Sequence, residues 1–252
     1  MQQISPIAIA FVVGLLVTPL IRRISLRIGL VDRPDGHRKL HKTPVPLGGG
    51  VAVLLASVLT VLLTLLLDGP GAESIRRQPH YTLGLLGAAT MICVVGLLDD
   101  RFAIRGRQKL VAQVVAVFLV VQSGMVIEQL EVFGWTLSLG LLAAPFTMAW
   151  LLGAINSLNL IDGVDGLAGT VAAILSITIA VLAGMTGQAA DAIFAWALAG
   201  GVLGFLAWNL PPARIYLGDA GSMLVGLVLG VLAIRSSLKG PATVAMADRK
   251  ST

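Results

Sequence analysis

Apolar residues are grouped in runs of about 20 residues, which is the length that crosses the hydrocarbon core of a bilayer as one α-helix. Shorter polar segments separate these runs. The pattern predicts spanning helices over residues 4–21, 47–67, 80–98, 109–127, 137–155, 167–184, 190–208 and 218–235. We therefore expect an all-α, polytopic membrane protein with about eight transmembrane helices around a cleft that faces the cytoplasm.

Composition supports this class. The 252 residues are 56% hydrophobic and 12% charged, with a mean hydropathy of +0.91, whereas soluble domains carry about 25% charged residues. We expect one transmembrane domain over residues 1–240 and a polar tail over 241–252. No basic segment precedes the first apolar run, so no cleavable signal is expected. The single cysteine, Cys93, lies inside an apolar run, which excludes a disulfide framework or a zinc cluster.

The cations are divided unequally between the two sides of the predicted helices. Twelve Lys and Arg residues fall on one side: Arg22, Arg23, Arg27, Arg33, Arg38, Lys39, Lys42, Arg101, Arg105, Arg107, Lys109 and Arg214. Six fall on the other: Arg76, Arg77, Arg235, Lys239, Arg249 and Lys250. Because cytoplasmic loops carry the excess of positive charge, the first side is predicted to be cytoplasmic and both termini to lie opposite.

Five carboxylates lie on the predicted cytoplasmic side, in "DDRFAIRGRQK", "NSLNLIDGVDG" and "WNLPPARIYLGDAGS". They are Asp99, Asp100, Asp162, Asp165 and Asp219. Acids at membrane helix ends are costly unless they are paired, hydrated or bound to a cation. Taken singly, each could cap a helix; taken together with the neighbouring glycines and asparagines, they indicate one site. Oxygen ligands without a thiolate or imidazole cluster favour Mg²⁺, with Mn²⁺ as the alternative.

Other residues on this side suit a phosphorylated ligand. Lys109, at the start of a predicted helix, could reach a phosphate beside the metal, or it could be an ordinary positive anchor. Tyr216 could stack on a nucleobase, although tyrosine is also common at membrane interfaces. His41, in a basic, proline-rich loop, is expected to have a structural or anion-contacting role. The glycine-rich helix starts at 48–50 and 218–222 suit anions. We infer phosphoryl transfer from a nucleotide donor to a lipid acceptor, with no nucleic-acid partner.

These segments resemble the polyprenyl-phosphate N-acetylhexosamine-1-phosphate transferases, also called glycosyltransferase family 4. The resemblance covers residues 1 to about 240 and is most specific in "NLIDGVDGLAG" and "PPARIYLGDAGSM". The loop "VDRPDGHRKLHKTPVPLGGG" and the "DDR" ending are more similar to the branch that uses UDP-N-acetylglucosamine (UDP-GlcNAc) than to the muramoyl-pentapeptide branch. The resemblance implies attack of undecaprenyl phosphate on the β-phosphorus of a UDP-sugar, with UMP released. It places the reaction at the cytoplasmic face of the inner (plasma) membrane, in cell-envelope polysaccharide synthesis.

The resemblance also implies roles for individual residues. Asp219 would be the main Mg²⁺ ligand, with Asn159, Asp99 and Asp100 beside it, and Lys109 would contact phosphate in catalysis. The uridine would be surrounded by Asp162, Asp165, Gly166 and Tyr216. Lys39 and His41 would belong to a substrate-phosphate loop.

The sequence departs from the family in two respects. Ala103 replaces the polar residue that usually ends the acidic motif, and the further spans and the His- and Arg-bearing loop of the family do not follow residue 240. A non-catalytic relative and a phospho-N-acetylmuramoyl-pentapeptide transferase are therefore alternatives. A transporter would place ionisable residues in mid-span, where none is found. A homodimer is left open.

Overall fold

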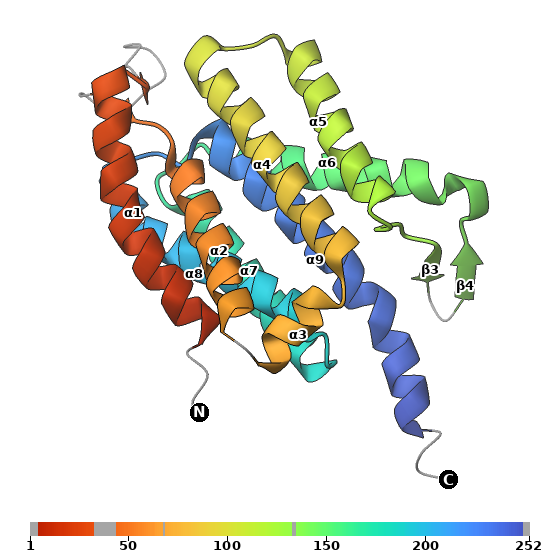
Figure 1. Cartoon of the computed structure of the whole chain (residues 1–252). Coiled ribbons are helices and arrows are strands. Elements are labelled where there is room, and N and C mark those ends of the chain that lie inside the picture. The colour runs from red at the N-terminus through yellow and green to blue at the C-terminus, as the bar shows by residue number, and fades with distance from the viewer. Residues whose placement is uncertain (1–4, 33–43, 68, 133–134, 249–252) are drawn as a thin grey trace.

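The computed structural model describes residues 5–32, 44–67, 69–132 and 135–248. The long helices are α1 (Pro6–Ile28), α2 (Gly49–Leu66), α4 (Pro79–Phe102), α5 (Gly106–Gln122), α6 (Ala143–Ile161), α7 (Leu167–Met185), α8 (Ala189–Asn209) and α9 (Gly218–Asp248). A short helix, α3 (Pro70–Arg76), joins α2 to α4, and a 3₁₀ turn (Gly140–Leu142) precedes α6. The all-α prediction is confirmed, and α1 begins on the side of the bundle where α9 ends (Figure 1).

Each of the eight predicted spans corresponds to a helix, but the count of eight spans is not confirmed. Within the described residues, seven helices are long and apolar enough to cross a membrane. The exception is α5, which has 17 residues and is therefore about 25 Å long against a hydrocarbon core of about 30 Å. The helix that the apolar run 109–127 predicted ends at Gln122, because Gly124 adopts a left-handed conformation with φ 87°.

Four short strands were not predicted. They form two antiparallel pairs, β1 (Val31–Asp32) with β2 (Val45–Pro46), and β3 (Gln129–Val132) with β4 (Trp135–Ser138). The second pair occupies the start of the predicted span 137–155, so the helical segment there begins only at Gly140. Strands this short carry too little periodicity to be recognised beside a long apolar run.

The core of the bundle is formed by α8 and α9, the two most buried of the candidate spans. The other long helices pack on one or both of them, except α5, which packs on α4 and α6 (Figure 1). Small residues allow close helix contacts. At one end, Gly50 of α2 and Gly96 of α4 lie directly against the backbone of Ala220 and Gly221 in α9. Any larger side chain at these two positions would collide with that backbone. The first turn of α9 is therefore held tightly between α2 and α4.

A buried ion pair lies near the opposite end of the same helices. The Arg235 Nε of α9 donates to Asp191 Oδ1 of α8 at 2.6 Å, and Arg235 Nη2 donates to Gln78 Oε1 at 2.6 Å. The guanidinium also lies 3.8 Å from the centre of the Tyr81 ring. Since the Asp191 side chain is 1% exposed, this cluster joins α4, α8 and α9 through groups that have little access to solvent.

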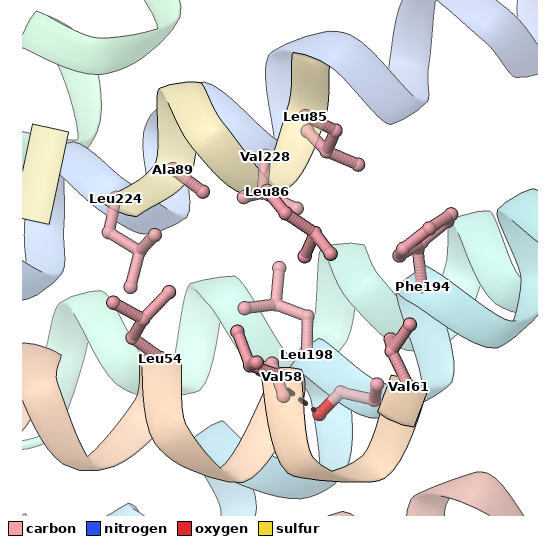
Figure 2. Close-up of a pocket in the computed structure, with 12 residues that line it drawn as sticks. Leu54, Val58, Val61, Leu85, Leu86, Ala89, Phe194, Leu198, Leu224 and Val228 are labelled. Carbon is pink, nitrogen blue, oxygen red and sulfur yellow. Dashed lines mark hydrogen bonds between the residues drawn. The ribbon is translucent and has the colours of Figure 1, made fainter. Parts of the chain in front are cut away.

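Between these two ends lies an apolar cavity of about 30 Å³ (Figure 2). Residues of α2, α4, α8 and α9 line it: Leu54, Ser57, Val58, Val61, Leu85, Leu86, Ala89, Phe194, Ala197, Leu198, Leu224 and Val228. The hydroxyl of Ser57, its one polar side chain, donates to the Ala197 carbonyl. This cavity offers no charged group, whereas charged side chains gather at the ends of the helices.

Candidate active site at the helix ends

Four helices bring their ends together around one ammonium group. Lys109, in the first turn of α5, lies 2.8 Å from Asp99 Oδ2 at the end of α4 and 2.7 Å from Asp219 Oδ2 at the start of α9. The side chain of Asp99 is 11% exposed and that of Lys109 is 17% exposed. Charges with this little exposure are screened weakly, so they interact more strongly than a surface pair. The site therefore combines two carboxylates and one cation in a sheltered position.

Asn159, near the end of α6, completes this cluster. Its Oδ1 accepts a hydrogen bond from Lys109 Nζ at 3.3 Å, and its Nδ2 donates to Asp219 Oδ1 and, at 2.9 Å, to the hydroxyl of Ser222. The Ser222 hydroxyl in turn donates to the Gly218 carbonyl at 3.0 Å. Both oxygens of Asp219 are thus held by partners from two other helices.

Asp100 points toward a different partner from that of Asp99. Its carboxylate accepts hydrogen bonds from the backbone N–H groups of Asp219 at 2.9 Å and Ala220 at 3.3 Å. These N–H groups have no partner within their own helix and lie at its positive end, where an anion is favoured. Gly218 makes the contact possible: it has φ 73°, and a side chain there would collide with the Asp100 carboxylate.

The segments predicted to surround the uridine are joined by hydrogen bonds. Asp165 Oδ2 accepts from the Ala213 N–H at 2.9 Å, and the Gly166 N–H donates to Asn209 Oδ1 at 3.1 Å. Asn209 also donates to the Ile215 carbonyl at 2.9 Å. The turn between α6 and α7 is therefore fixed against the chain that leads from α8 to α9.

Tyr216 lies at the base of the basic loop. Its N–H donates to the Pro46 carbonyl at 2.9 Å, and its carbonyl accepts from the Gly49 N–H at 3.0 Å. The antiparallel pair β1–β2 brings the two ends of the loop together at this place. Lys39 and His41 lie outside the described residues, so their role in binding substrate phosphate stays a prediction.

Asp162 follows the last residue of α6. Burial, together with the negative charges of Asp219 and Asp100, raises the pKa of its carboxyl from the ordinary value of 3.8 to about 7. A carboxyl with this pKa is protonated in the folded protein under conditions in which an exposed aspartate is charged. The contribution of Asp162 to stability is therefore greatest below its ordinary pKa and is lost as the pH rises through about 7.

Asp162→Asn should consequently stabilise the metal-free protein strongly at pH 8.5 and much less at pH 4.5, where the carboxyl of the folded protein is still protonated. Thermal unfolding in detergent with EDTA would measure this difference, because EDTA removes any cation that could neutralise the charge. Glu73→Gln, which removes an exposed carboxylate of α3, is the matched control. An equal shift of the unfolding temperature at both pH values would contradict the expected pKa.

The structure thus brings Asp99, Lys109, Asn159 and Asp219 into direct contact, with Asp100 one step behind them. Ser222 and Asn209 were not predicted as site residues, although they lie within "GDAGS" and "WNLPPAR". Gln113, the one polar residue in the apolar stretch from Leu110 to Val121 of α5, was not predicted either. The chemical roles of all these residues stay predictions.

The donor set suits a hard cation. In the described part of the chain, no three His, Cys, Asp or Glu side chains are arranged to hold a metal ion. Mg²⁺ does not need such a group, since it commonly takes one or two carboxylates and fills its other positions with water and substrate phosphate. Asp99, Asp219 and the Asn159 Oδ1 provide oxygen ligands, and both carboxylates already face a shared positive charge on Lys109. The residues present therefore fit Mg²⁺ or Mn²⁺.

Residues 82–237, which contain this whole cluster, match the family described as glycosyl transferase family 4. The chain belongs to this family. It is 34% identical over 234 residues to a probable undecaprenyl-phosphate N-acetylglucosaminyl 1-phosphate transferase of Bacillus subtilis, covering 90% of this chain and 62% of the relative. It is 36% identical over 253 residues to a phospho-N-acetylmuramoyl-pentapeptide-transferase of Moorella thermoacetica, covering 92% and 75%.

A third relative carries the same kind of name as the B. subtilis protein. The undecaprenyl-phosphate alpha-N-acetylglucosaminyl 1-phosphate transferase of Yersinia pestis is 29% identical over 212 residues, covering 81% of this chain and 55% of the relative. The chain therefore spans about three-fifths of the length of these N-acetylglucosaminyl relatives. The chain is therefore similar to relatives from both branches of the family that its motifs suggested.

Proposed function

We propose that this protein transfers a sugar-1-phosphate from a UDP-sugar to undecaprenyl phosphate. A phosphate oxygen of the lipid attacks the β-phosphorus of the UDP-sugar and forms the new P–O bond. The bond from the β-phosphorus to the oxygen that bridges the two phosphates breaks, and UMP leaves with that oxygen. The products are a lipid-linked diphospho-sugar and UMP.

The observation that carries the proposal is the cluster of Lys109, Asp99, Asp219 and Asn159 at the end of a membrane bundle. Phosphoryl transfer depends mainly on positioning and on neutralising negative charge. A lipid phosphate is already an anionic nucleophile, so no side chain has to remove a proton from it. Lys109 would neutralise charge on the phosphates, and Asn159 would hold the Asp219 carboxylate in place.

We further propose that Asp219 and Asp99 hold Mg²⁺ together with Asn159. A divalent cation supplies charge neutralisation at the diphosphate that one ammonium group alone does not give. The role of this chain is to hold the oxygens of Asp219 and Asp99 where the cation would bind. The Asp100 carboxylate fixes the start of α9, which carries Asp219. On this proposal, Asp162, Asp165, Gly166 and Tyr216 lie where the uridine binds.

The sugar we propose is N-acetylglucosamine. The "DDR" ending and the loop before α2 favour it, as does the B. subtilis relative. The alternative substrate, UDP-N-acetylmuramoyl-pentapeptide, is favoured by the M. thermoacetica relative, which this chain matches over a larger share of its length. The distribution of Lys and Arg supports a site on the cytoplasmic face of the inner membrane.

The proposal predicts Mg²⁺-dependent release of UMP. The purified chain in detergent would be given undecaprenyl phosphate and either UDP-GlcNAc or UDP-N-acetylmuramoyl-pentapeptide, and UMP would be quantified by chromatography. We expect release with UDP-GlcNAc, and loss of release with EDTA. Omitting the lipid controls for hydrolysis. Release with the pentapeptide donor alone would reverse the sugar assignment, and no release from a folded protein would favour a non-catalytic relative.

A further inference from the structure

A pair of amide side chains lies one helical turn below the candidate active site. Gln113 of α5 and Asn156 of α6 bond each other reciprocally: Gln113 Nε2 donates to Asn156 Oδ1 at 3.3 Å, and Asn156 Nδ2 donates to Gln113 Oε1 at 3.0 Å. Gln113 also donates to the sulfur of Met223 in α9 at 3.2 Å. Since Gln113 is 1% exposed, its amide depends on these partners for its hydrogen bonds.

Gln113, Asn156 and Met223 each lie one helical turn from a residue of the candidate site. Gln113 comes four residues after Lys109 on α5, Asn156 comes three residues before Asn159 on α6, and Met223 comes four residues after Asp219 on α9. Residues three or four apart lie on the same face of a helix. The same three helices that supply Lys109, Asn159 and Asp219 therefore meet again directly below them.

Five residues of α5 are buried, and Gln113 is the only polar one among them. The helix packs mainly on α4 and α6, and much of its surface is exposed, including Leu110 at 50% and Val111 at 63%. Apolar contacts between helices permit sliding, whereas a buried amide left without partners costs about 1–3 kcal/mol. Because the buried Gln113 depends on Met223 and on Asn156, an exposed residue of α6, for its hydrogen bonds, these bonds help to fix the position of α5 along α6.

We infer that Gln113 and Asn156 are positioning residues, which fix α5 so that the Lys109 ammonium lies between Asp99 and Asp219. They act through Lys109 and Asn159 and need not touch substrate. The consequence for catalysis rests on the proposed function, but the consequence for the placement of Lys109 does not.

The test compares Gln113→Leu with the wild type by two independent measurements. The first is the rate at which Lys109 is reductively methylated, followed by mass spectrometry with the other lysines as internal references. We expect severalfold faster labelling of Lys109 in the variant. The second is UMP release, whose kcat should fall about tenfold or more, because a catalytic group displaced by about 1 Å can cost a hundredfold. Gln122→Leu makes the same change at an exposed position of α5 and should alter neither measurement.

A double exchange, Gln113→Asn with Asn156→Gln, restores an amide pair across the same helices and should recover slow labelling and most of the kcat. Unchanged labelling of Lys109 in Gln113→Leu would overturn the inference whatever the activity. A lowered unfolding temperature with labelling that the exchange does not restore would overturn it as well, since the pair would then serve packing alone. If the wild type releases no UMP, the proposed function fails while the labelling comparison still decides this inference.

Discussion

Asp219→Asn should abolish UMP release while the bundle remains folded. Asparagine keeps the size of the side chain but removes the negative charge that faces Lys109 at 2.7 Å and accepts a hydrogen bond from Asn159. Because charge stabilisation dominates phosphoryl transfer, the rate should fall by at least two to three orders of magnitude. The measurement is UMP release at saturating UDP-GlcNAc and Mg²⁺, with thermal unfolding of the same preparation recorded beside it.

The matched control for this change is Glu128→Gln, which removes an exposed carboxylate after α5. It should leave the rate of UMP release unchanged. Near-normal turnover of Asp219→Asn would show that this carboxylate is needed neither to hold Lys109 nor as a metal ligand. A variant that fails to bind Mn²⁺ in a direct titration, but still turns over, would separate those two roles.

Asp191→Ala should destabilise the protein by about 3–5 kcal/mol, because it leaves the Arg235 guanidinium buried without its anion. The pair joins α8 to α9, and Arg235 also holds Gln78 and lies against Tyr81 of α4. Its loss therefore weakens contacts between three helices. Unfolding in detergent, followed by circular dichroism over a denaturant series, would measure the change in free energy.

The exposed pair of Glu73 and Arg77, 2.9 Å apart on α3, provides the comparison. Glu73→Ala should cost only about 0–1 kcal/mol, as surface ion pairs do. The double variant Asp191→Leu with Arg235→Met removes both buried charges together and should be far less harmful than Asp191→Ala alone. Equal losses from the buried and the exposed pair would show that Arg235 is not desolvated in the membrane-bound protein.

The sequence predicted the helices well because an apolar segment in a membrane has to satisfy all its backbone hydrogen bonds internally, which a helix does. It was less accurate where helices end. The run 109–127 continues to look apolar past Gln122, but Gly124 terminates α5 and a strand pair follows. Turns and short strands depend on backbone geometry that hydropathy does not record.

In the candidate site, too, the sequence predicted which residues take part but not how they pair. The motifs identified Asp99, Asp100, Lys109, Asn159 and Asp219, and the structure brings them together. The resemblance implied that Asp99 and Asp100 both lie beside the same Mg²⁺. In the structure the two carboxylates also have separate partners, since Asp99 faces Lys109 and Asp100 accepts backbone N–H groups of α9. Which partner each acid takes is decided by tertiary packing, so a single sequence does not reveal it.

The contact between Asp100 and the start of α9 has a consequence for biosynthesis. The two residues it joins are 119 positions apart in the chain, so a ribosome must translate four further long helices, α5 to α8, and the start of α9 before the contact can form. Until α9 is inserted, α4 and α5 present a carboxylate pair and a lysine without the helix that completes them. The candidate site is therefore assembled only once the start of α9 is in place, and a nascent chain cannot bind ligands through this cluster before then.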